Sequence, residues 1–325
     1  MTGKTIIIDC DAGVDDALAL IILIAAHKQK QIQIKAITCV NGNTALDNVI
    51  KNVFRTLDVC EATDIPVFKG AHAPLLCTPN VEEAVKDQYH GSDGFGDVYN
   101  TKVDTSILQT EHAVCALNRI TSECPSKITI VCLGPLTNIA LAMKMYPTFI
   151  NNVKEFYIMG GNITAKGNVT PQAEFNFYMD PESVHIVFNN NTKPLWLLPW
   201  ETCLKSKISH EWRKNILGQI DKPCMELMNN IENGCSKIRK KRFPTYIVCD
   251  AILAGILVQP KIAENIVSYH ADIELSGNRT RGQVVLDHLL SNKPNVFLIQ
   301  DFNSEMFKEL LISSHLLLQI LKLEL

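Results

Sequence analysis

The sequence predicts an α/β protein with an open, mostly parallel sheet and helices on both faces. Short apolar runs alternate along the chain with segments of helix length, a pattern typical of parallel strands joined by crossover helices. No linker, repeat or low-complexity tract interrupts this pattern, so residues 1–325 are predicted to form a single domain. Sites on such sheets lie at the carboxyl ends of strands, so the residues after each apolar run are the first candidates for function.

Each apolar run gives an expected strand. In chain order these are residues 5–9, 32–39, 65–69, 128–132, 155–159, 195–198, 269–275 and 296–299. The expected helices are residues 17–27, 45–61, 110–121, 138–145 and 181–189. Residues 203–245 are rich in Lys and Arg, and we expect them to form an exposed helical insertion with a solvated charged face that borders the site.

The composition excludes several classes of protein. The chain is 46% hydrophobic and 20% charged, which is ordinary for a globular protein. A net charge of −3 gives no reason to expect nucleic acid or a membrane surface as a partner. Asp9 and Asp11 break the first apolar run, which argues against a signal peptide. The cysteines form no CxxC pair, and a reducing cytoplasm is the expected location.

Four carboxylates follow the first strand within a few residues. Asp9 and Asp11 end the apolar run, a turn follows at Gly13, and Asp15 and Asp16 open the next helix. Like charges at this density repel one another unless a cation lies among them, and oxygen ligands favour Ca²⁺ or Mg²⁺. The alternative, acids placed at a helix N-terminus by its dipole, accounts for Asp15 and Asp16 but not for Asp9 and Asp11.

Further polar and glycine-containing turns follow the later strands. They are Val40-Asn41-Gly42-Asn43, His90-Gly91-Ser92-Asp93-Gly94, Leu133-Gly134-Pro135-Leu136-Thr137-Asn138, Met159-Gly160-Gly161, Gly167-Asn168, Ala173-Glu174-Phe175-Asn176, Cys249-Asp250-Ala251 and Arg279-Thr280-Arg281-Gly282. A simple Asn-Gly turn or a structural loop histidine would account for single elements of this set. The whole set in this order resembles the nucleoside hydrolases of the inosine-uridine-preferring family.

This resemblance implies a Rossmann-like fold and a Ca²⁺-dependent N-ribohydrolase that cleaves ribonucleosides to free base and ribose. It implies that Asp11, Asp16, Asp250 and the main-chain carbonyl of Leu133 hold the metal. Asp11 would also be the general base toward the attacking water. Asp9 would support the loop from behind.

The resemblance also implies a set of substrate-binding residues. Asp15 would bind the ribose 2′ and 3′ hydroxyls, and His90 would approach the base. The remaining substrate-binding candidates are Asn43, Met159, Asn168, Glu174, Asn176 and Asp250. We expect Thr137 and Asn138 to cap the following helix rather than to bind a ligand.

Cys249 departs from the family members that prefer inosine and uridine, which carry His before the distant Asp. A branch of the family with Cys at this position leaves the family assignment intact. Cys249 is therefore a candidate acid toward the departing base. The alternative is that Cys249 only packs beside the pocket, with base activation by His90 or solvent.

Two other functions remain open at this stage. One is a non-catalytic sensor of ribose or nucleosides on the same fold, although sensing would not require a general base. The other is a haloacid dehalogenase-type phosphatase, which also places Asp-x-Asp at a strand end but does not explain the Asp15-Asp16 pair. The expected partner is a small nucleoside, with no nucleic acid and no membrane, in a homodimer or homotetramer.

Overall fold

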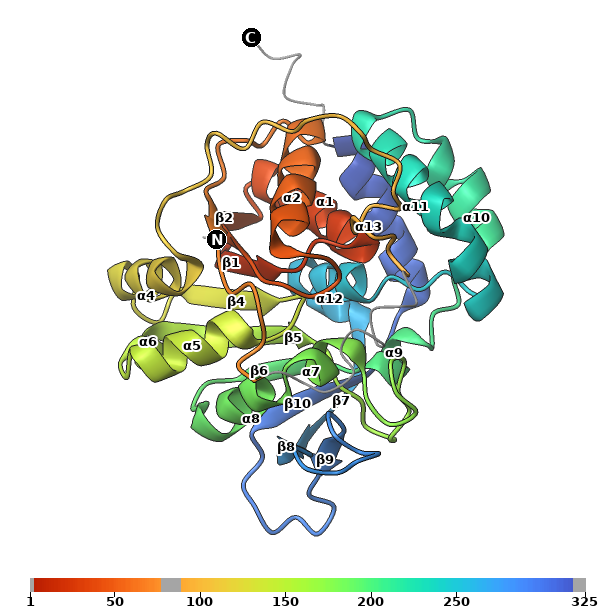
Figure 1. Ribbon diagram of the computed structural model, residues 1–325. Helices are drawn as coiled ribbons and strands as arrows, with labels where there is room; N and C mark the ends of the chain where they lie inside the picture. Colours follow the sequence, from red (N-terminus) through yellow and green to blue (C-terminus); the bar gives the residue numbers. More distant parts are fainter. Residues whose placement is uncertain (1–2, 77–88, 318–325) are drawn as a thin grey trace.

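A sheet of eight strands forms the centre of the molecule, in the order β3-β2-β1-β4-β5-β6-β10-β7 (Figure 1). The computed structural model describes residues 3–76 and 89–317. The strands are β1 (Lys4–Cys10), β2 (Ile32–Cys39), β3 (Val67–Lys69), β4 (Ile128–Cys132), β5 (Val153–Met159), β6 (Leu195–Leu198), β7 (Ala263–Tyr269) and β10 (Val296–Phe302). Every neighbouring pair is parallel except β10 and β7, which confirms the mostly parallel sheet.

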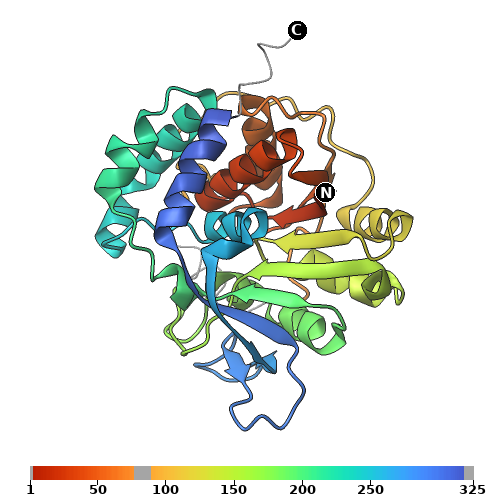
Figure 2. The same ribbon diagram turned by 180° about the vertical axis from the view of Figure 1, so that it is seen from behind.

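Helices cover both faces of this sheet (Figures 1 and 2). One face carries α1 (Val14–Lys28), α2 (Leu46–Val59), α11 (Pro223–Arg242), α12 (Cys249–Val258) and α13 (Ser304–Leu317). The other carries α4 (Ala113–Glu123), α5 (Thr137–Met145), α6 (Phe149–Asn152) and α8 (Pro181–Asn190). Three short helices, α7 (Phe175–Met179), α9 (Trp200–Cys203) and α10 (His210–Asn215), lie in the connections, and β8 (Ala271–Ile273) pairs with β9 (Val284–Leu286) in a separate small sheet.

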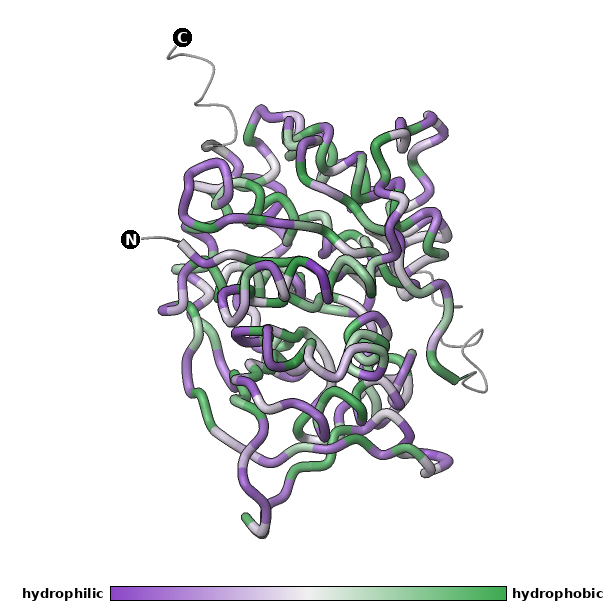
Figure 3. The backbone as a smooth tube through the Cα atoms, turned by 90° about the vertical axis from the view of Figure 1, so that its left-hand side faces the viewer, coloured by the Kyte–Doolittle hydropathy of each residue, from purple (hydrophilic) through white to green (hydrophobic). Residues whose placement is uncertain are grey.

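Helix α1 is buried on every side. Each residue from Val14 to Ala26 is buried, because α1 packs against α2, α11, α12 and α13 as well as the sheet. A helix surrounded in this way needs no polar stripe, and its sequence shows none. The outer helices instead alternate between hydrophilic and hydrophobic residues along their turns (Figure 3). The acids at the start of α1 are therefore carried on one of the most buried elements.

Two expectations about individual elements were wrong. Residues 269–275 do not form one strand: β7 ends at Tyr269, and β8 begins at Ala271 and pairs elsewhere. Strand β7 is an edge strand with mostly exposed or half-buried residues, so it shows no apolar run. Residues 203–245 are helical, but they are not simply an exposed insertion, because Met225, Met228 and Ile231 of α11 are buried and α11 packs against α1 and α2.

The residues that follow the parallel strands lie at one edge of the sheet. Asp11 follows β1, Asn43 follows β2, and Leu133 follows β4 directly. β1 pairs with both β2 and β4, so these residues emerge side by side. Among the described residues, no helix combines the length and the apolar character needed to cross a membrane.

Candidate active site

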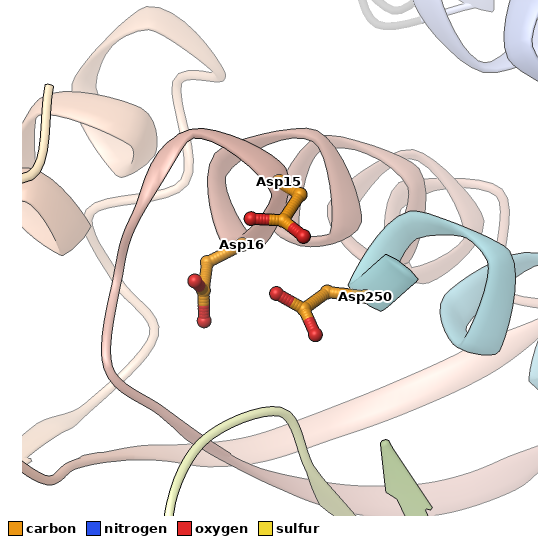
Figure 4. Close-up of side chains that lie close together, drawn as sticks. All are labelled: Asp15, Asp16 and Asp250. Carbon is orange, nitrogen blue, oxygen red and sulfur yellow. The ribbon is translucent and has the colours of Figure 1, made fainter. Parts of the chain in front are cut away.

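Three carboxylates meet at this edge of the sheet (Figure 4). Asp15 and Asp16 lie in the first turn of α1, and Asp250 lies in the first turn of α12. One oxygen atom from each can be chosen so that all three lie within 4.8 Å of one another. Because α1 packs directly against α12, the two helix starts bring acids from opposite ends of the chain into one group.

Asp11 lies beside this group, held by the turns after β2 and β4. Its Oδ2 accepts a hydrogen bond from the backbone amide of Asn43 at 2.7 Å. A Cβ atom on Gly42 would lie 2.1 Å from the same oxygen, and one on Gly134 would lie 2.8 Å from Oδ1. Both glycines are therefore needed for the backbone to approach Asp11 this closely. Asn43 Nδ2 also donates to Asp16 Oδ2 at 3.1 Å, which links the two acids.

The charges of these acids oppose one another. Burial, followed by the charge of neighbouring Asp15, raises the pKa of Asp16 to about 7. Burial, followed by the charge of Asp16, raises the pKa of Asp11 well above its usual value. Burial, followed by Asp15 and Asp16, does the same to the pKa of Asp250.

The oxygen atoms at this site fit a hard cation. Among the described residues, the buried atoms Asp11 Oδ1 and Asp16 Oδ1 have no hydrogen-bond partner. Unsatisfied buried carboxylate oxygens are costly, and oxygen-only ligands are what Ca²⁺ and Mg²⁺ prefer. The three carboxylates that lie closest together include Asp15, which the family resemblance assigned to the sugar. Asp11 lies beside these three carboxylates.

The carbonyl of Leu133 belongs to a residue that follows β4 and lines the cavity beside these acids. It accepts a hydrogen bond from Asn176 Nδ2 at 2.8 Å, and the carbonyl of Met159 accepts one from the same amide at 3.3 Å. A carbonyl oxygen has a second lone pair, so Leu133 can still contact a cation. Asn176 thus connects the start of α7 to the ends of β4 and β5.

A cavity of about 620 Å³ opens beside these acids. All eight of the substrate-binding residues expected from the sequence line it together. They are Asp15, Asn43, His90, Met159, Asn168, Glu174, Asn176 and Asp250, with Leu133 and Cys249 also in the wall. Asp11 and Asp16 are fully buried behind this wall.

Glu174 is a buried carboxylate held by backbone amides. It caps α7, with Oε1 accepting from the amide of Asn176 at 2.9 Å and Oε2 from that of Phe177 at 3.1 Å. The amide of Gly161 donates to Oε2 at 2.7 Å. Burial raises the pKa of Glu174 to about 7, although the three amides oppose this rise. Glu174 therefore closes the loop that begins at Gly161 and presents an acceptor to the cavity.

His90 approaches the start of α1 from a separate loop. Its Nδ1 accepts a hydrogen bond from the backbone amide of Val14 at 3.0 Å and lies 3.8 Å from Asp15 Oδ1. Because Nδ1 accepts this bond, the neutral ring carries its proton on Nε2. His90 is thus held in the cavity wall by the bond between its Nδ1 and the start of α1.

Aromatic rings form another part of the cavity wall, and the sequence did not single them out. Phe243 makes edge contacts with Trp200 at 5.5 Å and with Tyr89 at 6.3 Å between ring centroids. Tyr89 contacts the His90 ring in turn, at 4.8 Å. The position of Trp200 two residues after β6, at the carboxyl edge, was a usable signal. Tyr89 and Phe243 follow no strand and carried no such signal.

Cys249 lies in the cavity wall at the start of α12. Its side chain is nearly buried and lies beside the Cys203 thiol. Burial raises the pKa of Cys249 well above its usual value, and Cys203 and Asp15 add to the rise. A thiol in this environment is a poor proton donor at neutral pH.

Thr137 and Asn138 do not cap α5 with their side chains, so that expectation was wrong. Thr137 Oγ1 donates to Asp180 Oδ2 at 2.6 Å. Asn138 Nδ2 donates to Asp9 Oδ1 at 2.8 Å, and Thr38 Oγ1 donates to the same oxygen at 2.5 Å. Asp9 is therefore bound behind the acid loop and lies outside the cavity wall.

Comparison with known proteins identifies the family. The family model for inosine-uridine preferring nucleoside hydrolase matches residues 6–309. An inosine-uridine preferring nucleoside hydrolase of Leishmania major is 34% identical, over 87% of this chain and 88% of the relative. A pyrimidine-specific ribonucleoside hydrolase of Salmonella gallinarum is 31% identical, over 94% and 96% of the two chains.

A solved structure shows the same fold. An inosine-guanosine nucleoside hydrolase superposes with a TM-score of 0.86 at 27% identity, over 96% of this chain and 98% of that one. The family model spans nearly the whole chain, and the acids and cavity occupy the edge where such a sheet binds its ligands. The chain therefore belongs to the inosine-uridine preferring nucleoside hydrolase family, whose members are hydrolases that act on N-glycosyl bonds.

Proposed function

We propose that this protein is a Ca²⁺-dependent N-ribohydrolase that cleaves ribonucleosides to free base and ribose. The proposal rests mainly on a cluster of buried carboxylates at the edge of a cavity. Amide, carboxylate and aromatic side chains line this cavity. The family is one of metal-dependent hydrolases, and this donor set consists of oxygen atoms. The residues that would hold Ca²⁺ are Asp11, Asp16, Asp250 and, through its carbonyl, Leu133, with Asp15 close enough to contribute.

Ca²⁺ bound by these residues would supply positive charge, which would keep the buried acids ionised and favour ionisation of water. Asp11 is the proposed general base. Its unpaired Oδ1 is the atom that would accept a proton from the water that attacks C1′. The bond between C1′ and the base nitrogen breaks with its electron pair passing to the base, through a state with oxocarbenium character.

The sugar is proposed to bind on the polar side of the cavity. Asp15 would accept hydrogen bonds from the 2′ and 3′ hydroxyls, because its carboxylate is exposed to the cavity at the start of α1. Asn168, Glu174 and Asn176 would bind the rest of the ribose, with Met159 beneath the ring. The flat base would lie against the aromatic wall of Tyr89, Trp200 and Phe243, where ring contacts suit a conjugated leaving group.

We propose that the departing base is assisted by His90 or solvent rather than by Cys249. His90 carries its proton on Nε2, and neutral imidazole can donate a hydrogen bond to the leaving base. The raised pKa of Cys249 favours its role as a packing residue of the cavity wall.

A nucleoside panel tests the proposed function. Purified protein is incubated with Ca²⁺ and inosine, guanosine, adenosine, uridine or cytidine, and free ribose is measured by a reducing-sugar assay. Ribose release that is abolished by a chelator and restored by Ca²⁺ supports the proposal. Binding of nucleoside by calorimetry without ribose release would indicate a sensor, and phosphate release from phosphate esters would indicate a phosphatase.

We further propose that the protein acts in the cytoplasm as a homodimer or homotetramer. The low net charge of −3 is compatible with close association of copies. Light scattering coupled to size-exclusion chromatography measures the assembly, and a fluorescent fusion locates the protein in its cell. A monomer across the concentration range of the assay would contradict the assembly.

A further inference from the structure

The carboxylate of Glu201, in α9, binds a short stretch of backbone in the loop after β5. The amide of Ile163 donates to both of its oxygens at 3.0 Å, and the amide of Thr164 donates to Oε1 at 2.7 Å. The Thr164 hydroxyl adds a bond of 2.9 Å, and the amide of Lys166 approaches at 3.4 Å. One side chain therefore satisfies most of the donors of this stretch.

The backbone is shaped for an anion here. Ala165 has a φ of 58°, in the left-handed region that residues other than glycine seldom adopt. A left-handed residue between right-handed or extended neighbours turns successive N–H groups toward one point and forms a concave anion site. The Glu201 carboxylate occupies that concavity.

This stretch is the outer part of the loop that carries Asn168. The loop is closed at its base by the bond between the Gly161 amide and Glu174, at 2.7 Å. Asn162 Nδ2 donates to the carbonyl of Gln172 at 2.6 Å and ties the two arms together. Asn168 lies two residues beyond Lys166 and lines the cavity. Glu201 thus holds the arm that leads to Asn168.

Helix α9 fixes Glu201 to the central sheet. The amide of Trp200 donates to the carbonyl of Gly161 at 2.9 Å, and Thr202 Oγ1 donates to the carbonyl of Ile299 in β10 at 2.7 Å. The neighbour Trp200 lines the cavity. Because α9 is bonded to the sheet, the Glu201 carboxylate holds the loop at a fixed position relative to the sheet.

We propose that Glu201 is a positioning residue that sets Asn168 against the sugar. The proposal rests on the proposed nucleoside hydrolase function. Glu201 does not line the cavity. It acts through the backbone of residues 163–166, so its loss changes how well Asn168 binds the ribose rather than the chemistry at Asp11.

The test is Glu201→Gln, because the groups of residues 163–166 that contact the Glu201 carboxylate are all N–H or O–H donors. A glutamine amide group would oppose at least one of these donors. We expect kcat/KM for inosine to fall about tenfold, as one lost bond to a charged group implies. Glu201→Asp keeps both acceptor oxygens and should recover part of the loss. Glu155→Gln is the matched control, since Glu155 accepts from Thr129 and Trp196 on β4 and β6, away from the loop.

A double-mutant cycle separates positioning from general stability. If Glu201 acts through Asn168, adding Glu201→Gln to Asn168→Ala should lower kcat/KM by less than about twofold further. The proposal would be overturned if the fold-losses of kcat/KM in the two single variants multiplied fully in the double variant. A wild-type kcat/KM in Glu201→Gln would also overturn it.

Hydrogen exchange tests whether Glu201 holds the backbone of residues 163–166, and this measurement does not depend on activity. Amides 163, 164 and 166 should exchange faster in Glu201→Gln than in wild type, with the amides of β4 and β5 unchanged. Unchanged exchange in the loop would overturn the inference even if the enzyme cleaves nucleosides. Faster exchange in a protein that cleaves no nucleoside would instead support the role of Glu201 in holding this backbone, while contradicting the proposed function.

Discussion

Asn138 donates a hydrogen bond from Nδ2 to Oδ1 of Asp9 at 2.8 Å, joining the turn after β4 to the acid-bearing end of β1. The same group donates to the carbonyl of Cys39 at 3.1 Å, and its Oδ1 accepts from the amide of Ala71 at 2.9 Å. One fully buried amide therefore ties the ends of β1 and β2 to the segment after β3.

The first prediction concerns this amide. Asn138→Asp removes both donors and adds a buried negative charge beside Asp9, so we expect the free energy of unfolding to fall by at least about 1–3 kcal/mol. Urea titration measures the change, and Asn152→Asp is the control, because the side-chain bond of Asn152 to Ser122 is exposed. Equal stability of Asn138→Asp and wild type would show that the link between Asp9 and Asn138 contributes nothing.

The second prediction concerns Asp11. Asp11→Asn should lower kcat for inosine by several orders of magnitude, because it removes the proposed base and weakens a metal ligand together. General base catalysis alone contributes about 10²–10⁴-fold. Steady-state kinetics at saturating Ca²⁺, with circular dichroism to check the fold, make the measurement. Near-normal turnover in a natively folded Asp11→Asn would refute the mechanism.

The third prediction concerns Asp15. Removal of the 2′ hydroxyl leaves a buried acceptor unpaired, which costs about 1–3 kcal/mol. Inosine should therefore have a kcat/KM roughly tenfold to a hundredfold higher than 2′-deoxyinosine. Asp15→Ala should reduce this ratio toward one. The same kcat/KM for both nucleosides in the wild type would contradict the assignment of Asp15 to the sugar.

The fourth prediction concerns Cys249. Because burial raises the pKa of this thiol, we expect Cys249→Ala to affect inosine and a nitrophenyl riboside to the same extent. Nitrophenolate leaves without a proton, so a general acid matters only for inosine. A strong loss on inosine with the nitrophenyl compound spared would instead identify Cys249 as the acid.

The fifth prediction concerns stability at acid pH. His315 in α13 is fully buried, its Nδ1–H donates to the carbonyl of Leu311 at 2.7 Å, and burial lowers its pKa to about 4. The unfolded chain binds this proton near pH 6.5, so the contribution of His315 is complete above that pH and is lost as pH falls toward 4. The loss amounts to about 3 kcal/mol.

His315→Gln keeps a donor near Leu311 and cannot titrate. Its free energy of unfolding should therefore fall less than that of the wild type between pH 7 and pH 4.5. Urea titrations at several pH values make the comparison, and His72→Gln is the control because His72 is exposed. Parallel pH profiles for His315→Gln and wild type would rule out this histidine as a source of acid sensitivity.

The sequence predicted the sheet because its strands are short apolar runs with turn residues at both ends. β2, β4 and β6 lie where the runs predicted them, since these strands are largely buried. α12 was not predicted, because its ten residues are almost all buried and show no polar face to mark a helical period. α1 also lacks a polar face, but its apolar run is long enough to indicate a helix. β7 was not predicted for the opposite reason, since an edge strand exposes most of its residues.

The residues of the candidate site also differ in how well the sequence alone could predict them. The acids of the first loop could be found because they stand together in the chain, and Asp250 was found only through family resemblance. Glu201 and Phe243 act through contacts between segments that the sequence keeps far apart. Asn138 was misinterpreted because an amide at the start of a helix usually caps it, and only the packing of β1 against β4 gives it a different partner.

The meeting of Asp16 with Asp250 also has a consequence for how the protein folds. The two acids lie far apart in the chain, so the proposed cation site cannot form until α12 has docked against α1. Contacts between such distant segments form late, because the intervening chain must be ordered first. A cation that binds only the docked state stabilises it by mass action. Calcium should therefore slow the unfolding of the finished protein more than it speeds the early steps of folding.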